Sequence, residues 1–296
     1  MKLITFRTKE TADANENYYR VGSIGRGGRI ADLTELVSDT PLDAADVLEC
    51  FDLDSGFINE AAAAAEKVRS LERSEASLCP PVPRPGKVIC IGLNYRDHAE
   101  ESGMAIPASP IIFSKFPTSV TGPNSTIELP AESSEVDYEA ELAFIVGRRA
   151  SGVAAAEALE YVFGYTNFND VSARDLQFAD GQWQRGKSCD TFAPMGEYAV
   201  TRDEIADPHK LRISFRLNGE TLQDSTTGQM IFRIPELVEF LSRSITLEPG
   251  DVVATGTPPG VGFARSPKIF LRDGDLAEVE IEGLGTLRNP VRARAR

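Results

Sequence analysis

Apolar and polar residues alternate along many short segments of the chain, with the two-residue period of β-strands. Residues 18–36 alternate, turn at Gly25–Gly28 and alternate again, which predicts a β-hairpin. A second hairpin is predicted in residues 211–226 around Asn218-Gly219, a dipeptide typical of tight turns. Further strands are predicted in residues 87–95, in residues 137–147 and at the end of residues 152–170.

Fewer segments have the features of helices. Residues 58–71 contain the strong helix former EAAAAAEKV, and Pro235 is well placed to open a helix in residues 234–245. Shorter helices are predicted at residues 96–103, at the start of residues 152–170 and from Ser172 to Gln177. Residues 250–262 should form a strand that ends in a glycine-rich loop. The sum is a mixed α+β fold dominated by β-strands.

One proline-rich segment divides the chain. Residues 79–87, CPPVPRPGK, contain four prolines and a glycine, which disfavour both helix and strand. We therefore predict a small β-rich N-terminal domain at residues 1–78, a linker at 79–86 and a larger domain at 87–296.

Composition and charge exclude several classes of protein. The 296 residues are 42% apolar and 26% charged, as in an ordinary globular protein. A formal charge of −14 argues against nucleic acid or an anionic membrane as a partner. The four cysteines are scattered, without zinc-site spacing. With no apolar signal-peptide core at the N-terminus, these features predict a cytoplasmic protein.

Two glutamates precede a strongly apolar run in residues 137–147. Glu139 and Glu141 leave the same face of the predicted strand, and like charges in a poorly solvated place need water, protons or a cation nearby. Asp170 lies at the end of the next predicted strand. Three carboxylates form an oxygen-only ligand set for Mg²⁺, Mn²⁺ or Ca²⁺, but not for zinc. A solvated strand face and a helix-capping Asp170 are the alternatives.

Basic and polar residues follow closely in the sequence. Arg174 and Lys187 could offset the charge of an acidic metal site and bind an anionic substrate, or they could be surface cations. Gln177, one helical turn after Arg174, would share its face.

Two histidines are present, of which His98 has a carboxylate at helical spacing. Glu101, three residues on, could orient His98 as a general base for water, although an exposed pair without function has the same spacing. His209 is predicted to be a loop residue. The loop at residues 255–262, TGTPPGVG, could offer N–H groups and the Thr257 hydroxyl to a carboxylate, or it could be a plain turn.

Five stretches of the sequence resemble a known family as a set. They are, in chain order, GLNYRDHAEE, DYEAELAFIVG, NDVSARDLQ, RGKSCDTF and TGTPPGVG. Together they resemble the fumarylacetoacetate hydrolase superfamily, most of all its bacterial acylpyruvate hydrolase-like branch, from Lys87 to Val291. The resemblance implies a mixed β-sandwich roll, a homodimer and a divalent metal in a cleft. The first 80 residues are similar only to the variable leading domain of longer bacterial members.

The resemblance also implies roles for individual residues. Glu139, Glu141 and Asp170 would be the metal ligands, for Mg²⁺ or Mn²⁺, with Ca²⁺ able to replace them in a crystal. Lys187, Arg174 and Gln177 would hold or polarise the substrate, and Thr257 would bind its carboxylate. His98 and Glu101 would be a catalytic pair on a lid that orders when substrate binds.

The expected reaction is hydrolysis of a carbon–carbon bond in a 2,4-dioxo acid, an acylpyruvate or a diketo-deoxy sugar acid. Its products would be pyruvate and a carboxylic acid, as in the catabolism of aromatic or sugar acids. The His98–Glu101 pair favours this reaction, because a water-activating member needs it. The alternatives are an oxaloacetate-type decarboxylase, a hydroxymuconate-type isomerase or lyase, and a metal-binding scaffold without catalysis. Fumarylacetoacetate itself is disfavoured as substrate, because the chain lacks the leading domain of the mammalian enzyme.

Overall fold

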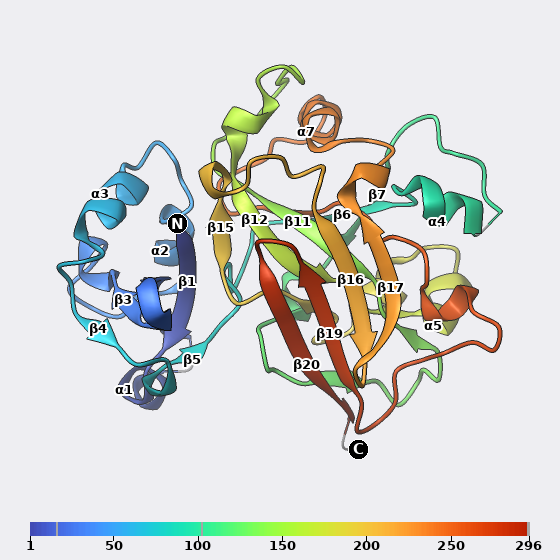
Figure 1. Cartoon of the computed structure of the whole chain (residues 1–296), viewed down its shortest axis with the longest axis horizontal. Coiled ribbons are helices and arrows are strands. Elements are labelled where there is room, and N and C mark those ends of the chain that lie inside the picture. Colours follow the sequence, from blue (N-terminus) through green and yellow to red (C-terminus); the bar gives the residue numbers. More distant parts are fainter. Residues whose placement is uncertain (16, 102, 295–296) are drawn as a thin grey trace.

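The computed structural model describes residues 1–15, 17–101 and 103–294. Its largest element is an eleven-stranded sheet that runs through the whole molecule (Figure 1). The strands follow the order β4 (Ser70–Leu71), β3 (Ile30–Asp32), β2 (Arg20–Ile24), β1 (Lys2–Arg7), β15 (Ala199–Thr201), β12 (Val162–Asn169), β11 (Ala140–Val146), β18 (Val252–Ala254), β6 (Val88–Gly92) and β7 (Ile111–Lys115), and β5 (Ser77–Leu78) pairs with β1. The predicted hairpin of residues 18–36 is confirmed as β2 and β3.

A second sheet of five strands packs on the middle of the first. Its order is β17 (Glu220–Thr226), β16 (Arg212–Leu217), β19 (Leu276–Ile281), β20 (Gly285–Ala293) and β9 (Ile127–Leu129). Two small pairs, β10 (Val136–Asp137) with β13 (Ser172–Ala173) and β8 (Val120–Thr121) with β14 (Ala193–Pro194), complete the strands. The second predicted hairpin is confirmed: Asn218 and Gly219 both have positive φ between β16 and β17. The prediction of a mixed, β-dominated fold is therefore confirmed.

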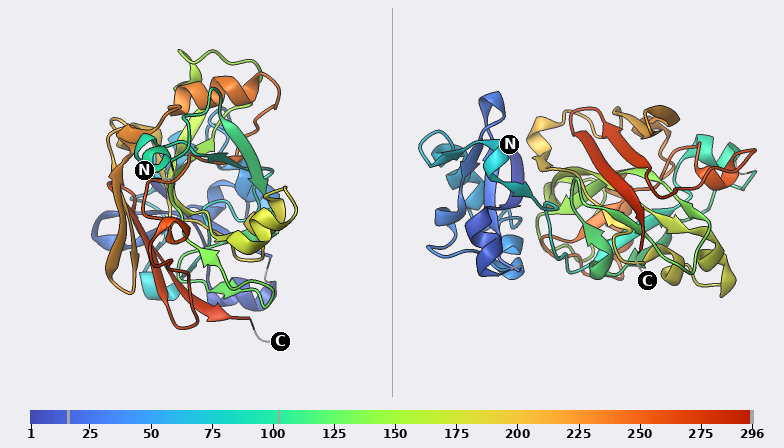
Figure 2. Two further views of the ribbon diagram at one scale, coloured as in Figure 1. Left: turned by 90° about the vertical axis from the view of Figure 1, so that its right-hand side faces the viewer. Right: turned by 90° about the horizontal axis from the view of Figure 1, so that it is seen from below.

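The helices of the described residues are short and lie at the edges of the sheets (Figures 1 and 2). They are α1 (Lys9–Ala14), α2 (Ala44–Glu49), α3 (Phe57–Ala64), α4 (Arg96–Glu101), α5 (Arg174–Ala179), α6 (Gln184–Lys187) and α7 (Ile234–Ser242). None of these helices has the length and apolar character needed to cross a membrane.

Several helix predictions are wrong in part. The predicted helix of residues 58–71 ends at Ala64, because the chain then turns and Arg69 accepts a hydrogen bond from Asp32 N before β4 pairs with β3. The predicted helix at the start of residues 152–170 is only a 3₁₀ turn, η5 (Ala158–Tyr161). Gly152 N and Val153 N instead bond to Ser242. Tertiary hydrogen bonds outweigh helix propensity in both places. Ser172 and Ala173, which were predicted to begin a helix, instead pair with β10 as β13, and α5 begins at Arg174.

The central strand β11 is buried on both faces. Leu142 and Phe144 pack in the core below the five-stranded sheet, whereas Ala143 and Ile145 belong to a second core shared with the N-terminal residues. Because side chains alternate along a strand, Glu139 and Glu141 point to the same side as Ala143 and Ile145.

The N-terminal residues continue the large sheet of the rest of the chain. Strand β1 pairs with β15 through Lys2 opposite Val200 and Leu3 opposite Ala199. The Thr5 hydroxyl donates to Pro81 O at 2.7 Å, which fixes the proline-rich segment against β1. The domain limits at 1–78, 79–86 and 87–296 remain a prediction, but residues 1–78 form a visibly separate lobe (Figure 2).

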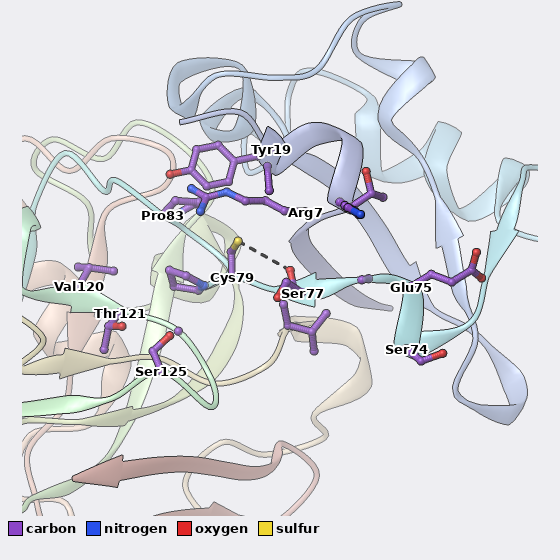
Figure 3. A pocket seen from close by; sticks show the side chains of 17 residues that line it. Arg7, Tyr19, Ser74, Glu75, Ser77, Cys79, Pro83, Val120, Thr121 and Ser125 are labelled. Carbon is purple, nitrogen blue, oxygen red and sulfur yellow. Dashed lines mark hydrogen bonds between the residues drawn. The ribbon is translucent and has the colours of Figure 1, made fainter. Parts of the chain in front are cut away.

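A hollow of about 630 Å³ lies where the N-terminal residues meet β8 and the segment after β5. Figure 3 shows Arg7 and Tyr19 on one side and Thr121 on the other, with Cys79 between them. Burial raises the pKa of the Cys79 thiol to about 11, so this cysteine is protonated and unreactive at neutral pH. The hollow contains none of the predicted site residues.

The shared sheet and core predict a single unfolding transition. Leu3 is 1% exposed in the second core, so Leu3→Ala should lower the free energy of unfolding of the whole chain by about 3 kcal/mol. Chemical denaturation followed by circular dichroism and by fluorescence should give coincident curves. Leu159→Ala, at a 39% exposed leucine, is the matched control and should change stability little. A transition confined to residues 1–78 would contradict the shared core.

Candidate active site

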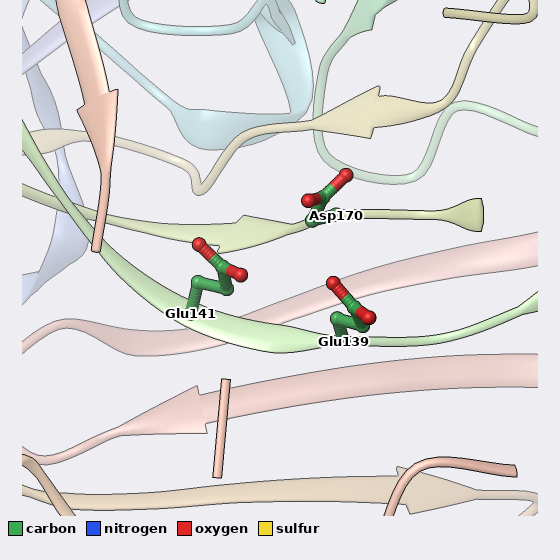
Figure 4. Close-up of side chains that lie close together, drawn as sticks. All are labelled: Glu139, Glu141 and Asp170. Atoms are coloured by element: carbon green, nitrogen blue, oxygen red, sulfur yellow. The ribbon is translucent and has the colours of Figure 1, made fainter. Parts of the chain in front are cut away.

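Three buried acids lie together where the paired strands β11 and β12 meet at one end: Glu141 near the start of β11, Glu139 just before it and Asp170 just after β12. Glu139, Glu141 and Asp170 are 7%, 1% and 0% exposed, and each offers a carboxylate oxygen within 4.8 Å of the others (Figure 4). The antiparallel register pairs Ala140 with Asn169, and Asp170 N donates to Glu139 O at 2.9 Å. This pairing brings Asp170 beside the two glutamates despite the sequence separation.

The predicted basic residues contact these acids directly. Lys187 Nζ donates to Glu139 Oε2 and to Asp170 Oδ2, both at 2.8 Å. Arg174 Nη2 donates to Glu139 Oε1 at 2.6 Å, and Arg174 Nη1 donates to Gln177 Oε1 at 3.0 Å, one helical turn along α5. Lys187 and Arg174 are therefore buried partners of the acid cluster rather than surface cations.

Two further charged residues complete the cluster and were not predicted. Lys115 Nζ donates to Asp170 Oδ1 at 2.5 Å and to Val171 O at 3.0 Å. Asp137 accepts from Arg174 Nε at 2.9 Å and from Gly262 N at 2.7 Å. Both positions agree with the alternation of side chains along a strand. Lys115 shares the inward face of β7 with Phe113, and Asp137 is two residues before Glu139. Strand parity was the available signal for both.

The cluster has one more negative than positive charge when all its groups are ionised. Its carboxylates are Asp137, Glu139, Glu141 and Asp170, and its cations are Lys115, Arg174 and Lys187. Burial alone would raise the pKa of Glu139, but the charges of Lys187 and Arg174 outweigh burial and lower it. Among the described residues, Glu141 has no cationic partner within ion-pair distance and accepts a hydrogen bond from Gly256 N.

The electrostatics of Glu141 fit a divalent cation. Burial raises the pKa of Glu141 well above its usual range, and the charges of Asp170 and Glu139 raise it further. A dication beside these three acids would remove that penalty and give the cluster one net positive charge. The all-oxygen donor set suits Mg²⁺ or Mn²⁺, as well as Ca²⁺, without deciding between them. The residues present therefore fit the predicted metal.

The predicted histidine–glutamate pair is held over the site by the glycine-rich loop. On α4, His98 Nδ1 lies 3.4 Å from Glu101 Oε2, a long hydrogen bond. Gly260 N donates to both oxygens of Glu101 at 3.0 Å, while Gly260 O accepts from Arg265 Nε at 3.0 Å and from Tyr138 OH at 3.1 Å. A Cβ on Gly260 would lie 2.1 Å from Leu222 O, so this position requires glycine.

Thr257 and His209, the remaining polar residues considered in the sequence, both already have hydrogen-bond partners within the protein. The Thr257 hydroxyl donates to Ala140 O and accepts from Gln223 Nε2, both at 2.9 Å. Its predicted role, donation to a substrate carboxylate, would require it to leave Ala140, so that role stays a prediction. His209 lies in a turn, as expected, where its Nε2 accepts from Ile234 N at 3.1 Å. Burial lowers the pKa of His209, which suits this acceptor role.

One cavity of about 460 Å³ joins these groups. Its polar lining comprises His98, Glu101, Glu139, Glu141, Arg174, Gln177, Lys187 and Thr257. Asp170 lies behind this lining, bonded to Lys187 and Lys115. The structure therefore brings eight of the nine predicted site residues to the wall of one cavity and places the ninth against them.

The chain belongs to the fumarylacetoacetate hydrolase superfamily. The model of the fumarylacetoacetate (FAA) hydrolase C-terminal family matches residues 87–292, nearly the span expected from the sequence motifs. This is a family of enzymes, and the resemblance inferred from the sequence is confirmed.

Two relatives with similar sequences are both named oxaloacetate tautomerases. The chain is 46% identical to the mitochondrial oxaloacetate tautomerase Fahd2a of Rattus norvegicus, over 90% of this chain and 85% of the relative. It is 41% identical to the mitochondrial oxaloacetate tautomerase FAHD2A of Homo sapiens, over 98% and 91%. These mitochondrial relatives contradict the predicted cytoplasmic location. That prediction was wrong because it tested only for a secretory signal peptide, which has an apolar core. Mitochondrial targeting peptides are amphipathic, so the missing apolar core does not argue against mitochondria.

Solved structures with the same fold cover nearly the entire chain. A fumarylacetoacetate hydrolase from Exiguobacterium antarcticum superimposes with a TM-score of 0.85 at 38% identity, covering 99% of this chain and 100% of the other. A maleylpyruvate hydrolase from Sphingobium has a TM-score of 0.82 at 30% identity with the same coverage. The N-terminal 86 residues, outside the family match, are thus also part of the shared architecture.

Metal affinity should depend on pH through Glu141. Because its pKa is raised without metal, a bound proton must leave before the cation binds, so affinity should fall as pH falls, by up to about tenfold per pH unit. Titration with Mn²⁺, following free Mn²⁺ by electron paramagnetic resonance, measures this slope. Glu141→Gln should bind Mn²⁺ more weakly and lose most of the slope. A wild-type affinity that stays constant with pH would contradict the assignment of Glu141.

Proposed function

We propose that this protein catalyses keto–enol chemistry on a 2-oxo acid, with the tautomerisation of oxaloacetate as its reaction. The observation that supports this most directly is the shared cavity. There, a cluster able to hold a divalent cation lies beside buried Lys187 and Arg174 and the His98–Glu101 pair. The tautomerases at 41% and 46% identity support the choice of reaction. The homodimer, and the lack of nucleic-acid or membrane partners, stay predictions.

The floor of the cavity is suited to the charged end of the substrate. A divalent cation held by Glu139, Glu141 and Asp170 would supply a Lewis acid for the oxygen on which enolate charge develops. Lys187 carries a positive charge at neutral pH: burial alone would lower its pKa, but the charges of Asp170 and Glu139 outweigh burial and raise it. Gln177, whose oxygen accepts from Arg174, presents its amide N–H groups to an anion.

The proton transfer falls to the pair on α4. Tautomerisation moves a proton between C3 and the 2-oxo oxygen and breaks no carbon–carbon bond. His98 Nδ1 faces Glu101, so its Nε2, which bonds to none of the described residues, would accept the C3 proton. The electrons of the C–H bond would form the C2–C3 double bond, and the π electrons of the 2-oxo group would move to its oxygen. Protonation of that oxygen gives the enol, and the reverse sequence gives the ketone. Gly260 fixes Glu101, which in turn orients the imidazole.

Hydrolysis of a 2,4-dioxo acid is the second candidate, because the same pair could activate water. His98, oriented by Glu101, would take a proton from water that attacks the carbonyl carbon C4. The C3–C4 bond would then break, giving a carboxylic acid and the enolate of pyruvate, which a proton converts to pyruvate. The maleylpyruvate hydrolase of similar fold supports retaining this reaction.

Product analysis separates the reactions. With Mg²⁺ or Mn²⁺ present, the enzyme should accelerate the loss of the ultraviolet absorbance of enol-oxaloacetate without releasing pyruvate, measured with lactate dehydrogenase. Pyruvate from oxaloacetate would instead identify a decarboxylase, and pyruvate from an acylpyruvate would identify the hydrolase. If none of these rates exceeds the metal-only control, the proposal is wrong.

The role of His98 can be tested separately from metal binding. His98→Ala should lower kcat for tautomerisation by at least about 100-fold, since it removes the general base. Its Mn²⁺ affinity should match wild type, because His98 lies outside the three acids. Glu100→Gln, at an exposed neighbour on the same helix, is the control and should keep full activity. Full activity of His98→Ala would exclude the proposed proton transfer.

A further inference from the structure

Apolar side chains form a large part of the lining of the active-site cavity, and this part is here called its apolar half. Met104, Phe178 and Phe263 line this half, yet they are 56%, 55% and 38% exposed. Large apolar side chains left open to solvent beside a binding site gain stability when a ligand covers them.

Two aromatic pairs form much of this apolar half. Phe113 of β7 contacts Trp183, just before α6, with ring centroids 5.3 Å apart. Phe178 of α5 lies 5.7 Å from Phe263 in the 3₁₀ turn η8 (Gly262–Ala264). The four rings come from separate elements and all line the one cavity.

Two of the aromatic rings lie beside the cations of the site. Lys187 Nζ lies 4.8 Å from the centroid of the Phe113 ring, and Arg174 Cζ lies 5.9 Å from that of Phe263. A 2-oxo acid whose carboxylate lies at Lys187 and Arg174 would therefore extend its other end along aromatic and aliphatic side chains.

We propose that this half of the cavity binds an apolar arm of the substrate, so that the site accepts, besides the short oxaloacetate, 2-oxo acids with an alkyl or aryl substituent and binds them more tightly than 2-oxo acids with a long charged arm. This inference rests on the proposed 2-oxo acid chemistry at the acid cluster. A charged arm would lose hydration against Met104, Phe178 and Phe263 without gaining a hydrogen bond, whereas an apolar arm would cover exposed apolar surface. The apolar lining thus favours an uncharged arm over a charged arm of similar length.

The single tryptophan of the chain reports on this half of the cavity. Trp183 lines it, so its fluorescence measures binding without any turnover. The Mg²⁺-loaded enzyme would be titrated with pyruvate, which has no arm, with 2-oxooctanoate, which has an alkyl arm, and with 2-oxoadipate, which has a charged arm. Since each buried methylene tightens binding about fourfold, 2-oxooctanoate should bind at least about tenfold more tightly than pyruvate. Affinity for 2-oxoadipate should not exceed that for pyruvate.

Two phenylalanine variants test whether the preference for an alkyl arm comes from this half of the cavity. Phe178→Ala should reduce the ratio of 2-oxooctanoate to pyruvate affinity several-fold, and it should fold normally because the side chain is more than half exposed. Phe116→Ala, at a 54% exposed phenylalanine outside this cavity, should leave the ratio unchanged. Equal affinities for pyruvate and 2-oxooctanoate would overturn the proposal. An equal loss of affinity for both ligands in Phe178→Ala would also overturn it, because that residue would then not contact the arm.

The result of this binding experiment does not depend on whether the enzyme tautomerises oxaloacetate. Tighter binding of the alkyl 2-oxo acid by an enzyme that does not tautomerise oxaloacetate would uphold the apolar subsite and reject the proposed reaction. Tautomerase activity without any preference for the alkyl arm would do the reverse.

Discussion

The burial of Glu141 is the constraint on which the rest of the site depends. Its carboxylate is 1% exposed and lies beside two other acids. Lys187, Lys115 and Arg174 compensate those two neighbours, whereas the described contacts of Glu141 are limited to an N–H donor at Gly256. A charge in that position requires a proton or a cation, because desolvation is otherwise too costly. The carboxylate of Glu141 therefore requires a bound proton or cation, and it lies at the wall of the active-site cavity.

Strand geometry supplies the acids, and two cores hold the strands in place. Asp137, Glu139 and Glu141 share one side of the chain, and the register of β11 with β12 delivers Asp170 beside them. Apolar packing on both faces of β11 prevents a shift by one residue, which would turn the glutamates away from the cavity. The N-terminal residues contribute Leu3 to one of these cores, so a lobe distant from the chemistry still stabilises the strand that carries it.

Local patterns in the sequence predicted what is local in the structure. Strand parity placed Glu139 with Glu141, helical spacing placed Arg174 with Gln177, and the turn dipeptide placed the hairpin of β16 and β17. Lys115 and Asp137 were missed: the alternation of side chains along a strand was a signal for both, but their ion pairs form between segments that meet only in the folded chain. The alanine-rich segments were predicted to be longer helices because bonds such as Gly152 N to Ser242 O are invisible in the sequence.

The acid cluster by itself does not select between tautomerisation and carbon–carbon hydrolysis, because both pass through an enolate of a 2-oxo acid. In the two proposed reactions the difference would arise at His98, whose Nε2 would meet either a C3 proton or a water molecule. What the substrate carries beyond C3 decides which of these fits there. The proposed arm, lying against Phe178 and Phe263, would displace water from that part of the cavity and strengthen the remaining electrostatic interactions. Phe178 and Phe263 are exposed, whereas the acids are buried. Substitutions at these aromatic residues could therefore change substrate specificity while the cluster around Glu141 stays the same.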